Sequence, residues 1–255
     1  MGALKAVLLY TFRQHLRTKI LMIVVFFGLL LVVAGLVVST LAMEERKRVL
    51  LNIGLGGIEF LALLTVVFAA VNLIVEEVES RSIYLILTHP IKRSRYVLGR
   101  YLGTVSAIGL GMAVMAVFHL LSLFAANWNW DPLYLVALLF SFGKILIMSA
   151  IAFLLSLFST SAAASMAFTI FIWMVGHFSE ELKFMAERAI NPIAKLMINS
   201  VYYAAPNLSY FSYKDFWVAG RLPDASFIGW AGIYAVSYIW ICMIISNYLF
   251  SQKEF

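Results

Sequence analysis

The stretch ILMIVVFFGLLLVVAGLVVSTLA, Ile20–Ala42, has 23 residues and no charged side chain. A helix rises about 1.5 Å per residue, so roughly 20 apolar residues cross a hydrocarbon core of about 30 Å. The run is longer than the roughly 7–15 apolar residues of a secretory signal, so we expect it to remain as a transmembrane span. It predicts an all-α integral membrane protein.

Five more apolar runs of similar character follow along the chain. With the first they predict six transmembrane helices, at 20–42, 53–75, 97–126, 133–158, 160–177 and 227–249. Composition agrees, because 63% of the 255 residues are hydrophobic and 13% are charged, whereas about 25% are charged in soluble domains. We therefore expect residues 1–255 to form a single transmembrane domain.

Lysine and arginine predict the direction of insertion. With the N-terminus inside, ten of these bases and four acids lie on the inner side, and eight of each lie on the outer side. The net charge of +6 then falls on the inner side, as it does in membrane proteins with basic cytoplasmic loops. The cluster Arg46–Arg48 is the exception. We expect a multi-pass protein of the cytoplasmic (inner) membrane with both termini inside (N-in, C-in).

Two segments outside the spans have helical amphipathic patterns. Residues 1–19 predict an interfacial helix with its basic residues on lipid headgroups, although an extension of the first span is an alternative. The outer loop, 179–226, predicts short re-entrant or shallow helices at Glu180–Ile190 and Ile193–Val201, before the last span. A docking surface for a periplasmic partner is the other interpretation of this loop.

The sequence contains no recognisable catalytic, cofactor-binding or metal-binding pattern. The single cysteine, Cys242, excludes an intrachain disulfide and a CxxC motif. No GxxxxGK[ST] motif is present to bind ATP phosphates, and no HExxH motif is present. We expect a protein that is not itself an enzyme, needs no cofactor and has no nucleic-acid partner.

Glu59 and Lys144 are the only charged residues well inside the predicted spans. A lone charge there costs at least about 2.5–3.5 kcal/mol and normally finds a partner. The two positions lie at similar depths, so we expect an intramembrane ion pair in the outer part of the pathway. In the alternative interpretation each side chain lies near water, with Lys144 reaching toward the interface.

The predicted inner loop, 76–96, contains seven charged residues, three acidic and four basic. Ser82–Leu87 can form a short helix, which ends before Pro90 because the residue preceding a proline is disfavoured in helical conformation. A solvated loop with ordinary inner-side bases is the alternative.

The segment VEEVESRSIYLILTHPIKRSRYVLGRYLG, residues 75–103, resembles the first cytoplasmic loop of ABC-2 type permeases, the membrane subunits of prokaryotic ABC exporters. The branch associated with multicopper-enzyme maturation, including the nitrous-oxide-reductase accessory permease, is the most similar. The positions that carry the resemblance are Glu79, Ile83, Leu85, Leu87, Pro90, Arg93, Leu98, Gly99 and Arg100. Arg81-Ser82 departs from the Gly-Thr common in the family. The later segment APNLSYFSYKDF, residues 205–216, is also similar to a family pattern.

The resemblance implies a permease that dimerises and couples to separate ATPase subunits through a coupling helix in the first cytoplasmic loop. The implied coupling residues are Glu76, Glu79, Arg81, Ile83, Tyr84, Leu87, His89, Pro90 and Arg93. The expected partners are an ABC ATPase, a second permease copy and membrane lipid. An ATP-energised scaffold for a periplasmic maturation complex is the first alternative, and a secondary transporter is the second.

Overall fold

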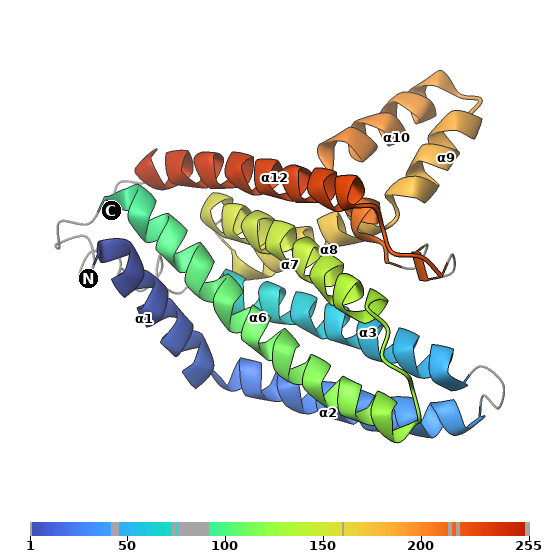
Figure 1. The fold of residues 1–255 in the computed structure, drawn as a ribbon. Coiled ribbons are helices and arrows are strands. Elements are labelled where there is room, and N and C mark those ends of the chain that lie inside the picture. Colours follow the sequence, from blue (N-terminus) through green and yellow to red (C-terminus); the bar gives the residue numbers. More distant parts are fainter. Residues whose placement is uncertain are drawn as a thin grey trace.

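A computed structural model describes residues 2–41, 46–72, 75, 92–159, 161–213, 216–217 and 220–252. Every regular element in these ranges is helical, which confirms the all-α prediction. Figure 1 shows long helices packed side by side, with a pair of short helices projecting from one end. The chain termini lie together at the opposite end.

The helices follow one another in the order expected from the apolar runs. The first half contains α1 (Ala3–Arg17), α2 (Lys19–Leu41), α3 (Arg46–Thr65), the π-helical η1 (Val66–Ala70) and α6 (Arg93–Ala125). The second half contains α7 (Leu133–Phe158), α8 (Ala162–His177), α9 (Ser179–Arg188), α10 (Pro192–Ala204), the 3-10 helix η2 (Leu208–Phe211) and α12 (Ala225–Gln252).

Four described helices are long and apolar enough to cross a membrane: Arg48–Ala70, α6, α7 and α12. A fifth span would need α8 and α9 together, and these two helices meet at 66°. Helix α2 has 23 residues and includes the apolar stretch Val24–Val38. The multi-pass membrane fold is therefore supported, while the count of six spans stays a prediction.

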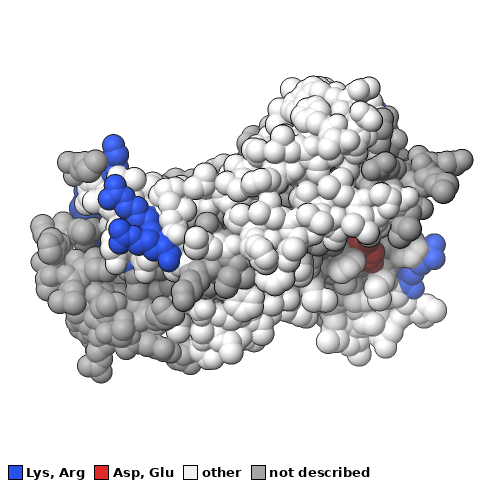
Figure 2. All heavy atoms as spheres, turned by 90° about the horizontal axis from the view of Figure 1, so that it is seen from below, with Lys and Arg blue, Asp and Glu red and all other residues white. Residues whose placement is uncertain are grey.

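Helix α7 has the predicted bounds, but α3 begins at Arg46, ahead of the predicted start at Ile53. The basic cluster that the sequence puts in an outer loop therefore stands in the first turn of a helix. Figure 2 shows Lys and Arg at both ends of the molecule, with the larger group at the end that carries α1, and uncharged side chains along the described surface between them. This distribution suits a protein whose middle lies in lipid.

Helix α1 packs along the first half of α6 (Figure 1). Gly103 permits the close approach, since a Cβ there would lie 2.7 Å from the carbonyl oxygen of Leu8. The buried residues of α1 are Val7, Thr11 and His15, so the face that packs on α6 is partly polar. The polar side chains are accommodated because α6 supplies hydrogen-bonding partners for them.

Candidate functional site

A buried ion pair joins α3 to α7. The ammonium of Lys144 lies 2.8 Å from Oε1 of Glu59, and the hydroxyl of Ser141 donates to Oε2 at 3.0 Å. Ser141 and Lys144 are three residues apart on α7 and therefore share one helix face. The side chains of Lys144 and Glu59 are only 6% and 8% exposed. The two predicted intramembrane charges thus meet, and each neutralises the other.

A cavity of about 450 Å³ opens beside this pair, between the bundle and the base of the α9–α10 hairpin. Its charged lining consists of Glu59, Lys144, Glu180 and Glu181. Its aromatic lining consists of Phe60, Trp173, His177, Phe178 and Tyr213. Burial, and then the negative charge of Glu59, raises the pKa of Tyr213, so this phenol stays neutral. The site can hold a small ligand in contact with both charge and aromatic rings.

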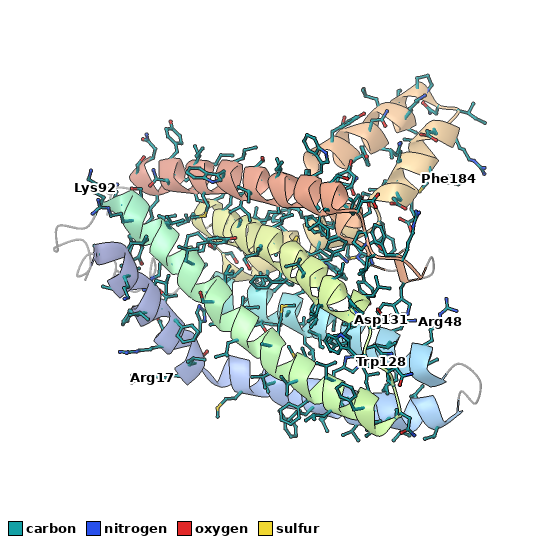
Figure 3. All side chains as sticks on the ribbon, viewed as in Figure 1. Arg17, Arg48, Lys92, Trp128, Asp131 and Phe184 are labelled. Carbon is teal, nitrogen blue, oxygen red and sulfur yellow. The ribbon has the colours of Figure 1, made fainter. Side chains whose placement is uncertain are left out.

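The α9–α10 hairpin projects from the bundle, and its helices carry exposed apolar side chains such as Phe184 (Figure 3). Hydrogen bonds of Asn207 hold the base of the hairpin in place. The side-chain oxygen of Asn207 accepts hydrogen bonds from the Ser179 hydroxyl at 2.8 Å and the Ser209 backbone N–H at 3.1 Å. The backbone N–H of Asn207 donates to the Tyr234 hydroxyl on α12 at 2.8 Å. One residue therefore links α9, η2 and α12.

Two glycines without side chains allow η2 and its neighbouring residues to pack closely against the bundle. A Cβ on Gly143 of α7 would lie 2.8 Å from the ring of Phe211, and one on Gly176 of α8 would lie 2.5 Å from the carbonyl oxygen of Pro206. Leu208 and Phe211 are buried there. The APNLSYF segment thus forms one wall of the cavity and fixes its position relative to α7 and α8.

The opposite end of the bundle holds the first turns of α6. The Arg93 guanidinium donates to the backbone carbonyls of Ser251 at 2.8 Å and Phe250 at 3.3 Å, near the end of α12. The ring of Tyr96 stacks on Phe250 with centroids 5.6 Å apart. A cation suits a helix C-terminus because the last carbonyls carry partial negative charge. The start of α6 is therefore bonded to the end of α12.

Buried polar contacts also join α6 to α1. Arg100 is fully buried and donates to Thr11 at 3.0 Å and Gln14 at 2.9 Å. His15 Nε2 lies 2.9 Å from the Thr104 hydroxyl. Burial, and then the neighbouring Arg100 charge, lowers the pKa of His15 to about 4. The imidazole is consequently neutral in the folded protein near pH 7.

Of the predicted coupling residues, Arg93 is described, and it bonds to backbone carbonyls near the end of α12. The others lie outside the described residues: Glu76, Glu79, Arg81, Ile83, Tyr84, Leu87, His89 and Pro90. Their role in coupling stays a prediction.

Sequence reasoning did not identify the cavity or most of its lining. Glu180 and Glu181 occur in the first turn of α9, where acids are common because they stabilise a helix N-terminus. Trp173 and Tyr213 occur in segments rich in apolar and aromatic residues. The spacing of Ser141 and Lys144 on one helix face was a usable signal. Within the described ranges, no group of three or more His, Cys, Asp or Glu residues is placed to hold a metal ion.

Comparison with known proteins gives one family. Residues 38–179 match a family model described as ABC-2 family transporter protein. The matched part runs from the end of α2 to the start of α9 and includes both Glu59 and Lys144. No curated protein matches the chain. The branch within the family stays a prediction.

Proposed function

Because the chain belongs to the ABC-2 family of transporter proteins, we propose that it is the permease subunit of an ATP-driven exporter in the cytoplasmic membrane. ATP hydrolysis would take place in a separate ATPase subunit, and two permease copies would enclose the pathway. The family match over more than half of the chain is the observation that carries this proposal.

The contacts around the start of α6 support a coupling role for the preceding loop, 76–96. Arg93 bonds the first turn of α6 to the end of α12, and Arg100 bonds the next turns to α1. A displacement imposed on the loop would therefore act on three helices together. Such a connection suits a subunit that converts movement of an attached ATPase into movement of its spans.

The test uses the permease expressed with its candidate ATPase partner and reconstituted in lipid. Glu79→Lys and Tyr84→Ala alter the polar and the apolar part of the predicted coupling helix, and Thr88→Ala is the control in the same loop. We expect both variants to lose the stimulation of ATP hydrolysis by the permease, with normal permease yield. The control should keep this stimulation.

Two results would overturn the proposal: purification from native membranes without any ATPase, or full stimulation in both variants. Flux into sealed vesicles is measured in parallel. ATP-dependent flux of a solute supports export, whereas ATPase coupling without flux of any tested solute would replace export by transmission of force.

A further inference from the structure

The cavity beside the Glu59–Lys144 pair has more negative charge than its own residues balance. Lys144 is neutralised by Glu59 at 2.8 Å. Glu180 and Glu181 then leave the lining with more acids than bases, because three carboxylates face one lysine and one histidine. Their position in the first turn of α9 favours that helix, but it does not account for their presence on a cavity wall.

Aromatic rings form much of the remaining wall. Trp173 stacks on His177 with ring centroids 5.2 Å apart, and the ring of Tyr213 is buried against the same space. Aromatic faces attract cations, most strongly when the ring is that of tryptophan. Carboxylates and aromatic faces together favour a positively charged ligand with an organic surface.

Size and geometry separate an organic cation from a metal ion. The cavity of about 450 Å³ falls in the usual range for small-molecule sites, roughly 300–1,000 Å³. Among the residues that the structure describes, no three His, Cys, Asp or Glu side chains are grouped to hold a metal ion. We propose that this cavity binds the ammonium group of an organic cation, with Glu180 and Glu181 supplying the charge and Trp173 supplying the aromatic face.

The ammonium group has two sources, a free amine or the headgroup of an ethanolamine phospholipid. The chemistry of recognition is the same for both, and the experiment distinguishes them. The inference goes beyond the proposed function, because binding is measured on the permease alone and needs no ATPase.

The experiment titrates tetraethylammonium chloride into the full-length permease in phosphatidylglycerol nanodiscs, with binding followed by calorimetry against sodium chloride at equal ionic strength. The variants are E180Q/E181Q and Trp173→Leu. The matched control is Glu187→Gln, which removes an exposed acid from the same helix but outside the cavity. We expect saturable binding, with Kd raised about tenfold in each variant and unchanged in the control.

A second titration replaces half of the phosphatidylglycerol by phosphatidylethanolamine. A higher apparent Kd for tetraethylammonium would identify the lipid headgroup as the ligand, and an unchanged Kd would identify a free amine; both results support an ammonium site. Absence of saturable binding would overturn the inference. Equal loss in Glu187→Gln and E180Q/E181Q, or tighter binding of inorganic phosphate than of tetraethylammonium, would also overturn it.

Discussion

The ammonium of Lys144 on α7 donates to the carboxylate of Glu59 on α3 at 2.8 Å, and the second carboxylate oxygen accepts from Ser141. Removing one member of a buried pair leaves the other charge without compensation, which typically costs about 3–5 kcal/mol. We expect Glu59→Gln and Lys144→Met each to lower stability by about that amount. The double variant should be no less stable than either single variant. Thermal unfolding in nanodiscs measures all three.

Ser141→Ala is the control for this cycle. It removes one hydrogen bond to the carboxylate and leaves the charges balanced, so we expect a loss of about 1 kcal/mol. Strictly additive losses from Glu59→Gln and Lys144→Met would show that the two side chains do not stabilise the protein as a pair.

The contrast between this pair and the cavity explains what the sequence could predict. A charge within an apolar run is conspicuous, and two such charges at similar depth suggest a pair. The cavity, in comparison, combines side chains from α3, α7, α8, α9 and the segment around η2. No local pattern in the sequence indicates that these segments meet, because their arrangement depends on packing over the whole bundle.

Helix α1 illustrates a second limit. Its amphipathic pattern correctly predicts a helix at the N-terminus, with Lys5, Arg13 and Arg17 exposed. The pattern ranks residues by hydrophobicity, so it does not predict that Thr11 and His15 are the buried ones. Their burial depends on Arg100 and Thr104, which lie far along the sequence on α6.

Docking of α1 onto α6 should depend on pH through His15. Its pKa is lowered from 6.5 to about 4 in the folded protein, first by burial and then by Arg100. A solvated α1 therefore binds more protons than a docked one between these values. The free energy that favours docking of α1 onto α6 has its full value above pH 6.5. It decreases as the pH falls toward about 4, by about 3 kcal/mol over that interval.

Distances between nitroxide labels at the exposed positions Lys5 and Ser106 would follow this docking from pH 7.5 to pH 4. We expect the distribution to broaden on acidification in the parent protein. His15→Gln keeps a polar side chain without a titrating group, so its distribution should change little with pH. Equal broadening in both proteins would show that His15 is not responsible.

Gly103 controls the approach of α1 to α6. A Cβ there would lie 2.6 Å from the Cβ of Thr11 and 2.7 Å from the Leu8 carbonyl oxygen, so the backbone itself must move. We expect Gly103→Ala to lower stability by about 1–3 kcal/mol, the usual cost of overpacking. Gly232→Ala on α12 is the control, because a Cβ there meets nothing within 4 Å. Thermal unfolding of the two variants tests the difference, and similar midpoints would contradict the packing argument.

Asn207 fixes the base of the α9–α10 hairpin, since its side chain accepts from Ser179 and Ser209. Asn207→Ala removes these bonds and those to the hydroxyls of Ser209 and Tyr202, and each hydrogen bond contributes roughly 0.5–1.5 kcal/mol. We expect faster hydrogen–deuterium exchange throughout α9 and η2, with little change in α7. Asn191→Ala is the matched control, because the Asn191 side chain bonds only the Ile193 N–H at the start of α10. Exchange in this control should rise only in the first turn of α10. If both variants changed α9 equally, Asn207 would not be the residue that anchors the hairpin.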